Sequence, residues 1–323
     1  MKNYLFSALF ITFLIAFAPF VTLISFNTAS TETINDTLYD SSDDGTVRVL
    51  QVSSNRILET DITEYLIGAV ASEMPATFNE EALKAQAVAS YTYLKWIMLN
   101  SDNASRALWD ISDDSSTHQG FLTTDQMKER WKDKYDTYYS KIRKAVESVQ
   151  NEYIVYGKEP VLAVFHGLSP GKTADSADVW GESIPYLVSV DAPGDKLSPD
   201  LVSTNSFTYD ELSAILEAVE GIPTENIDKK EWIKVLSSAE NGYVKEVNVG
   251  NSTLSGTELK ALLSLKSPNF TVNFDDDKIE FTVYGKGHGL GMSQYSADFL
   301  ARQGYDYKEI LEHFYPHTEL LTD

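Results

Sequence analysis

The sequence has 323 residues, 43% of them hydrophobic, which is enough for one large buried core or two modest ones. Its 26 Lys and Arg stand against 48 Asp and Glu, a net charge of −22 that no basic block interrupts. This disfavours nucleic acid as a partner, because phosphates are bound by clustered Lys and Arg. There is no cysteine, so disulfides and thiolate metal ligands are excluded.

The chain starts with a long apolar run. After Lys2, the stretch from Tyr4 to Phe26 contains no charged residue and is long enough to cross a bilayer as a helix. It exceeds a typical signal-peptide core, and no clear small-x-small cleavage site follows. The sequence predicts an uncleaved single-pass anchor at residues 1–26, with Lys2 inside the cell. A cleaved signal peptide is the alternative, and both interpretations place residues 27 onward outside the cell.

Residues 27–46 are rich in Ser, Thr and Asp and lack periodicity, which predicts a flexible linker. The catalytic domain is expected to cover residues 47–323. Its first helix is expected to begin after a capping box made by Asp61 and Glu64, and to end near Glu73 because Pro75 disfavours helical geometry at the preceding residue.

The rest of the domain mixes helices and strands. Apolar spacing predicts further helices at about 80–98, 125–149, 209–220, 229–237 and 257–264, one that ends at Gly304, and one that is capped by Asp306 and stops before Pro316. Alternation predicts strands at 47–52, 153–156, 161–165, 244–249, 270–274 and 278–284. Without regular βαβ alternation, this order predicts an α+β fold in one extracytoplasmic unit.

Three segments carry more turn and polar residues than a simple core needs. The first is Glu73-Met74-Pro75, where the charged glutamate faces the unfavourable end of the helix dipole and is thereby suited to holding a proton. The second is the loop 165–173. The third is 285–294, whose four glycines between Gly285 and Gly291 indicate close approach to a ligand or to another part of the chain.

Other chemistries find little support. The glycine-rich segment matches neither nucleotide-binding motif, because Met follows its last glycine. No H-x-x-x-H or H-E-x-x-H pair lies on a predicted helix, so no metal and no cofactor is expected. No nucleophile elbow is present either, which disfavours esterase and protease chemistry. The alternative for Glu73 is a solvated glutamate at a helix end that has no catalytic role.

Taken together, the segments resemble the stage II sporulation protein D family, bacterial lytic transglycosylases related to the amidase-enhancer proteins. The resemblance rests on Tyr65 to Tyr93, with its E-M-P and E-A-L-K-A-Q-A-V-A motifs, on Val179 to Asp191 and on Gly285 to Leu320, with a weaker match at Ser255 to Phe270. It extends from about residue 47 to the last residue of the sequence.

The resemblance implies that Glu73 protonates the glycosidic oxygen and then, as a base, helps the muramyl C6 hydroxyl attack C1. No second carboxylate is needed, unlike in most glycoside hydrolases. Substrate contacts are expected from polar residues of the two loops, for each of which a loop-stabilising hydrogen bond is the alternative role: His166, Ser169, Lys172, His288, Ser293 and Gln294. Substrate contacts are also expected from Lys84, Gln86 and Tyr91.

The sequence also departs from the family pattern. Tyr91 stands where the family commonly has arginine, and the family's H-S-T-S-G-G-K-T and G-W-G-H-G read H-G-L-S-P-G-K-T and G-K-G-H-G. Some members bind zinc through Cys and His in the region that corresponds to residues 110–121. Here Ser112 and Gln119 take the cysteine places and only His118 remains, so zinc is not expected.

Two functional hypotheses follow from the resemblance. The first is a glycan-cleaving enzyme that acts beside a peptide-stripping amidase and a membrane scaffold of the engulfment machinery, in the mother-cell membrane facing the forespore. Its substrate is the peptidoglycan glycan strand, preferably without peptides. The second is a non-catalytic glycan-binding protein that stimulates an amidase. Glu73 favours the first, and Tyr91 with the altered loops favours the second.

Overall fold

The computed structural model describes residues 45–101, 108–218 and 228–323. These residues form an α+β fold with several small sheets, as the sequence predicted. The predicted anchor at 1–26 and most of the predicted linker lie outside the described residues, and Thr46, the last linker residue, already belongs to a strand. Within the described ranges, no helix is both long and apolar enough to cross a membrane.

The chain divides into two compact units. Unit 1 is Met1–Leu162 together with Glu319–Asp323, and unit 2 is Ala163–Thr318. The last strand of the sequence therefore returns to unit 1 after the chain has passed through all of unit 2.

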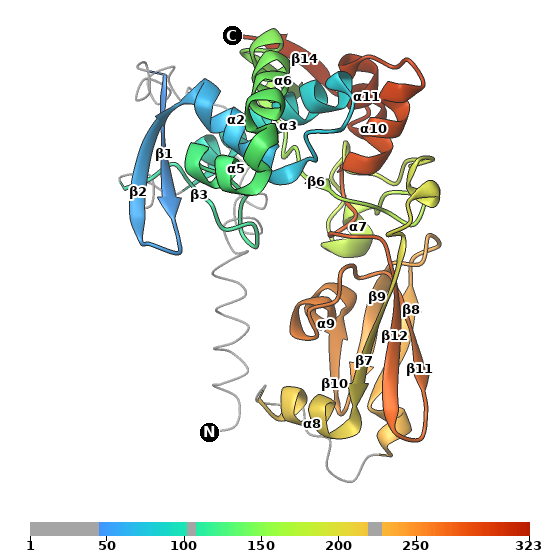
Figure 1. The fold of residues 1–323 in the computed structure, drawn as a ribbon. Helices are drawn as coiled ribbons and strands as arrows, with labels where there is room; N and C mark the ends of the chain where they lie inside the picture. The colour runs from blue at the N-terminus through green and yellow to red at the C-terminus, as the bar shows by residue number, and fades with distance from the viewer. Residues whose placement is uncertain (1–44, 102–107, 219–227) are drawn as a thin grey trace, which may run out of the picture. The chain divides into compact units, whose positions relative to one another are not determined.

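The described residues of unit 1 form helices and two small sheets (Figure 1). Its helices are α2 (Ile62–Glu73), α3 (Glu80–Asn100), α5 (Thr124–Trp131) and α6 (Tyr135–Ser148). Its strands are β1 (Thr46–Gln51), β2 (Arg56–Asp61), β3 (Ile111–Ser112), β4 (Glu152–Tyr156), β5 (Glu159–Pro160) and β14 (Glu319–Thr322). The sheet orders are β2-β1-β3 and β14-β4-β5, and α3 packs against α2, α6 and β4.

The predicted helix ends are confirmed in α2 and α3. Asp61 caps α2 by accepting from the backbone N–H of Thr63 at 2.7 Å, and Asn79 caps α3 in the same way. The predicted continuous helix over 125–149 is wrong, because α5 and α6 are separated by a 3-10 turn that begins at Lys132. Lys132 has a φ of 51°, which no α-helix accommodates.

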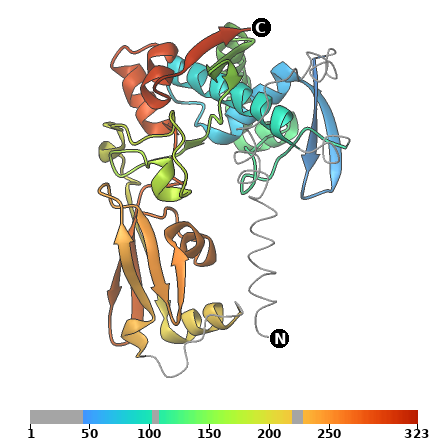
Figure 2. The ribbon, with the colours of Figure 1, turned by 180° about the vertical axis from the view of Figure 1, so that it is seen from behind.

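Unit 2 combines a layered α/β part with a set of long loops (Figure 2). Its strands are β6 (Phe165–His166), β7 (Val202–Thr208), β8 (Ile233–Ser238), β9 (Val244–Val249), β10 (Ser252–Ser255), β11 (Phe270–Phe274), β12 (Lys278–Tyr284) and β13 (Met292–Ser293). Its helices are α7 (Ser176–Val179), α8 (Tyr209–Glu217), α9 (Gly256–Leu262), α10 (Gln294–Arg302) and α11 (Tyr307–Phe314).

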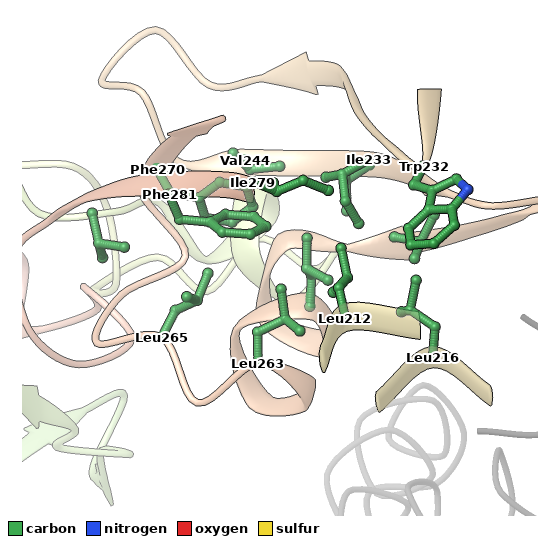
Figure 3. Close-up of a cluster of buried hydrophobic side chains, with 14 of the residues drawn as sticks. Leu212, Leu216, Trp232, Ile233, Val244, Leu263, Leu265, Phe270, Ile279 and Phe281 are labelled. Carbon is green, nitrogen blue, oxygen red and sulfur yellow. The ribbon is translucent and has the colours of Figure 1, made fainter. Parts of the chain in front are cut away.

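Two three-stranded sheets, β10-β9-β8 and β11-β12-β7, share one apolar core with α8 and α9. In Figure 3, leucines of α8 and of the α9 region lie opposite Ile233, Phe270 and Phe281 of the sheets. Two predictions are wrong in this unit. Residues 233–238 form β8 rather than a helix, and residues 161–164 are not part of a strand.

Candidate functional site

Glu73 is the last residue of α2, and the sequence explains why the helix stops there. Pro75 restricts Met74 to extended geometry, and Met74 indeed has φ −113° and ψ 143°. The Glu73 side chain is partly exposed, and its Oε1 accepts a 2.6 Å hydrogen bond from the backbone N–H of Gly120. The carboxyl group therefore lies in a fixed place at the surface of unit 1.

Cationic side chains bind the backbone on both sides of Glu73. Arg130 of α5 donates to the carbonyl of Ala71 at 3.0 Å, and Lys141 of α6 donates to the carbonyl of Ala76 at 3.0 Å. Positive charge at a helix C-terminus offsets the helix dipole. At the end of α2, the repulsion between the helix dipole and the Glu73 carboxylate is therefore weaker than the sequence pattern alone predicts.

Two buried tyrosines lie in the electrostatic field of Glu73. Burial, and then the Glu73 charge, raise the pKa of Tyr93 above its ordinary value. Burial also raises the pKa of Tyr65, whose hydroxyl accepts from Gln119 Nε2 at 2.6 Å. Both phenols therefore remain neutral at physiological pH and border the glutamate with polar but uncharged groups.

The three other candidates of unit 1 already have partners within the unit. Lys84 forms a 2.7 Å ion pair with Glu81, one turn earlier in α3. Gln86 is fully buried and donates to Ser90 at 3.1 Å, inside the packing of α3. Of the three, only Lys84 keeps exposed surface of any extent. Substrate contact by these residues stays a prediction.

Tyr91, which replaces the expected arginine, is held by the C-terminal strand region. Its hydroxyl donates to Asp323 Oδ2 at 2.7 Å, and Lys95 binds the same oxygen at 2.7 Å. Burial, followed by the hydrogen bond to Asp323, raises the pKa of Tyr91 to about 12, so the phenol keeps its proton. Lys95 also lies 4.4 Å from the centroid of the Tyr153 ring, a cation–π contact.

The region that corresponds to the family's zinc site does not fit a metal. Ser112 Oγ lies 2.8 Å from His118 Nδ1, and the Gln119 amide donates to Tyr65. A hydroxyl and an amide replace the thiolates that zinc prefers. Across the residues that the structure describes, no group of three or more His, Asp or Glu side chains is arranged to hold a metal ion.

In unit 2, the predicted loops 165–173 and 285–294 lie side by side. β6 pairs in parallel with β13, so that His166 stands opposite Ser293. Leu168 and Lys286 exchange two backbone hydrogen bonds, of 3.0 and 2.7 Å. The structure therefore brings together the five predicted candidates His166, Ser169, His288, Ser293 and Gln294 in one part of unit 2.

His166 and His288 both bind the backbone of Leu290. His166 Nδ1 donates to the Leu290 carbonyl at 3.0 Å, and the Leu290 N–H donates to His288 Nδ1 at 3.0 Å. Burial lowers the pKa of His166 to about 4. Burial, and then the neighbouring His166, lower the pKa of His288 to about 3. Both rings are therefore neutral near pH 7, with opposite tautomers.

A buried carboxylate that the sequence reading missed joins these loops. Asp195 is fully buried and accepts from the backbone N–H and hydroxyl of Ser169, both at 2.6 Å. Ser293 donates to it at 2.7 Å and Ser296 at 2.8 Å. Burial raises the pKa of Asp195 against the opposing effect of these hydrogen bonds. Ser169 and Ser293 thus donate to Asp195 and have no exposed surface.

The two remaining candidates of unit 2 differ in exposure. Lys172 is exposed and lies 3.6 Å from Asp191 Oδ1. Gln294 is buried at the first turn of α10. Among the candidates in unit 2, Lys172 is thus the one that carries charge at the surface.

The glycine-rich segment approaches other parts of the chain rather than an open space. Gly289 and Gly291 have φ values of 87° and 67°. A Cβ at Gly289 would overlap the Tyr243 ring, and one at Gly291 would overlap the Val164 carbonyl. Of the two explanations that the sequence left open, close approach of chain segments is the one seen here.

Comparison with known proteins gives consistent matches. A model of the family described as stage II sporulation protein matches residues 51–156, which include Glu73. The chain is 33% identical over 275 residues to stage II sporulation protein D of Bacillus subtilis, covering 85% of this chain and 78% of that protein. It is 32% identical over 269 residues to stage II sporulation protein D of Bacillus amyloliquefaciens, covering 83% and 76%.

A more distant relative has a different name. The chain is 26% identical over 303 residues to the amidase enhancer of Bacillus subtilis, covering 79% of this chain and 40% of that protein. The identity to the two sporulation proteins exceeds this value and extends over three quarters of their length. The chain belongs to the stage II sporulation protein D family.

Proposed function

We propose that the chain cleaves peptidoglycan glycan strands as a lytic transglycosylase, with Glu73 as its acid and base. The observation that carries this proposal is the partly exposed carboxyl group at the end of α2, held by the Gly120 N–H within the segment that matches the family. A glutamate that is merely exposed to solvent at a helix end does not need a hydrogen bond that fixes the orientation of its carboxyl group.

The geometry fits a single carboxyl group that moves a proton twice. Because Oε1 of Glu73 accepts the Gly120 N–H, the other oxygen is the stronger position for a proton. That proton passes to the glycosidic oxygen as the bond to C1 breaks. The carboxylate then takes the proton of the muramyl C6 hydroxyl while the C6 oxygen forms a bond to C1. The enzyme regains its starting state, and the product is a 1,6-anhydro sugar.

The proposal includes a place of action and partners. Similarity to sporulation proteins and to an amidase enhancer supports a cell-wall role in sporulation beside a peptide-stripping amidase. The neutral glycan backbone suits a chain of net charge −22, which repels anionic polymers. The apolar run at residues 4–26 supports attachment to the membrane, with the catalytic part outside the cell.

Product analysis in heavy-oxygen water tests the proposal. The protein is incubated with glycan strands that lack peptides, and the fragments are weighed by mass spectrometry. An intramolecular C6 hydroxyl outcompetes water because its effective concentration is on the order of 10⁵ M or more. The fragments are expected to carry no label and to weigh one water less than hydrolytic products. Labelled reducing ends would show hydrolysis and overturn the proposal.

Replacement of Glu73 provides the residue-level test. Glu73→Gln keeps the shape and the Gly120 hydrogen bond but cannot donate a proton, so cleavage is expected to fall by roughly 10²- to 10⁴-fold or more while glycan binding persists. Glu129→Gln, an exposed glutamate on α5, is the matched control and is expected to leave cleavage unchanged. Full activity of Glu73→Gln would remove this residue from the mechanism.

A non-catalytic amidase-stimulating protein is the second candidate function. It is favoured by the similarity to an amidase enhancer and by the engagement of Tyr91 with Asp323 in place of an arginine. Glycan binding without any fragments, combined with faster release of peptides by an added amidase, would select this function over cleavage.

A further inference from the structure

Residues 119–122 lie along α2. The Leu122 N–H donates to the Gly68 carbonyl at 3.1 Å, and the Phe121 ring stacks on the Tyr65 ring with 5.6 Å between centroids and 14° between planes. A Cβ on Gly68 would overlap the Phe121 ring, so the absence of a side chain there lets the segment approach the helix closely. These contacts fix the last two residues of the segment.

The Gln119 side chain fixes the first residue of the segment. It is buried, and its Nε2 donates to the Tyr65 hydroxyl at 2.6 Å and to the Ser90 carbonyl at 3.2 Å. Because a carbonyl oxygen can only accept, the amide nitrogen is the atom that faces Ser90. One side chain therefore joins the segment to α2 and to α3.

The hydrogen bond to Glu73 comes from the peptide unit that begins at Gln119. The N–H of Gly120 lies in the same plane as the Cα of Gln119, and this plane moves as a rigid body because the C–N bond does not rotate freely. That N–H donates to Glu73 Oε1 at 2.6 Å. A displacement of Gln119 is therefore transmitted to the hydrogen bond that orients the carboxyl group.

Burial excludes a direct role of this cluster in substrate contact. Gln119 is 4% exposed, and Tyr65 and Ser90 have no exposed surface. A glycan strand at the surface of unit 1 cannot reach these atoms. Any effect of Gln119 on cleavage must therefore act through the position of Glu73, which alters the rate of the chemical step rather than the binding of substrate.

We propose that Gln119 is a positioning residue for glycan cleavage. Its amide, anchored on Tyr65 and Ser90, holds the peptide plane that presents the Gly120 N–H to Glu73. The inference rests on the proposed function of Glu73 and deepens it, because it assigns the orientation of the carboxyl group to a side chain that touches neither the glutamate's proton nor the sugar. Precise orientation of a reacting group requires such supporting contacts.

Three variants test this role. Gln119→Met keeps the length of the side chain and removes both hydrogen bonds. Its kcat on peptide-free strands is expected to fall about tenfold with KM within about twofold, since misplacement by about 1 Å costs up to roughly 10²-fold. Tyr65→Phe keeps the ring that stacks on Phe121 and is expected to show a smaller loss of the same kind. Thr92→Val, the control, loses the buried hydrogen bond to the Val88 carbonyl in α3 and is expected to retain kcat.

The Gly120 amide proton gives a second readout, which does not depend on cleavage. A short hydrogen bond to a carboxylate moves an amide proton resonance downfield and slows its exchange. With isotope-labelled glycine, the resonance is assigned by its loss in Gly120→Ala. Gln119→Met and Tyr65→Phe are expected to move it upfield and to speed its exchange, whereas Thr92→Val is expected to leave it in place.

The two readouts separate this inference from the proposed function. If the unmodified chain releases no fragments, the proposed function fails, and the resonance in Gln119→Met then decides whether Gln119 orients the Glu73 carboxyl group. An unchanged Gly120 resonance in Gln119→Met would overturn the inference. So would a rise in KM with kcat unchanged, or an equal loss of kcat in Thr92→Val.

Discussion

The backbone N–H of Gly120 holds Oε1 of Glu73 at 2.6 Å, although 47 residues separate the two in sequence. A Cβ at position 120 would lie 2.9 Å from that oxygen and would overlap Ser72 Oγ. A side chain at position 120 would therefore displace the Glu73 carboxyl group or the Ser72 hydroxyl. The hydrogen bond and the missing side chain together fix the direction of the carboxyl group.

Gly120→Ala is expected to reduce glycan cleavage by roughly 10- to 100-fold, because displacement of a reacting group by about 1 Å has effects of that size. Rates are measured with glycan strands. Ser72→Ala, which only removes a neighbouring hydroxyl, is the control and is expected to retain activity. An unchanged rate in Gly120→Ala would show that the glycine does not position the Glu73 carboxyl group for cleavage.

Asp195 is expected to be one of the most sensitive polar residues of unit 2. In the unmodified chain, serine hydroxyls donate to the Asp195 carboxylate. Asp195→Asn places an amide NH2 group, itself a donor, against these hydroxyls. The free energy of unfolding is expected to fall by roughly 3 kcal/mol, against about 1 kcal/mol for Ser296→Ala, which removes one donor. Urea unfolding of both variants gives the comparison. Equal losses would show that the carboxylate is not the centre of this cluster.

Tyr91 is expected to stabilise unit 1 rather than to limit cleavage. Tyr91→Phe removes the hydrogen bond to Asp323 and keeps the ring, so the free energy of unfolding is expected to fall by about 1 kcal/mol. The cleavage rate is expected to stay within about twofold, because Lys95 still holds Asp323. A large loss of cleavage without loss of stability would instead assign Tyr91 to substrate binding.

The two neutral histidines of unit 2 make stability depend on pH. His166 has a pKa of about 4 in the folded chain, below the ordinary value of 6.5, so the unfolded chain takes up its proton first as the pH falls. Stability is therefore lost from pH 6.5 downward to about pH 4, by up to about 1.4 kcal/mol per pH unit for each such histidine. His166→Asn retains a donor for the Leu290 carbonyl but does not titrate. Its unfolding free energy is expected to depend less steeply on pH over this window, and an unchanged slope would contradict the assignment.

Local signals in the sequence predicted several elements of both units. The ends of α2 depend on Asp61 and Pro75, both of which act within a few residues. β12 was predicted with its observed ends, because its alternating pattern of burial has a period of two. In contrast, the predicted helix is interrupted at Lys132, where no glycine or proline marks a helix end in the sequence.

Non-local contacts explain what the sequence did not reveal. Residues 233–238, which were predicted to be mostly helical, become a strand because β9 pairs with them. Asp195 binds serines that lie 26 to 101 residues away, and no spacing rule connects such positions. Gly120 escaped notice for the same reason. Glu73 was found because a local motif, the glutamate before Met-Pro, coincided with a family resemblance.

The return of β14 to unit 1 has a consequence for the order of assembly. β14 pairs with β4, with Leu320 opposite Ile154, so unit 1 lacks one strand until all of unit 2 has been synthesised. Lys95 and Tyr91 likewise receive their Asp323 partner only at that stage. Without these last residues, β4 would have an open edge and Lys95 would lose its 2.7 Å ion pair with Asp323. Because unpaired backbone groups at a strand edge can pair with other chains, the sheet of unit 1 is protected on this side only after the whole of unit 2 has been made.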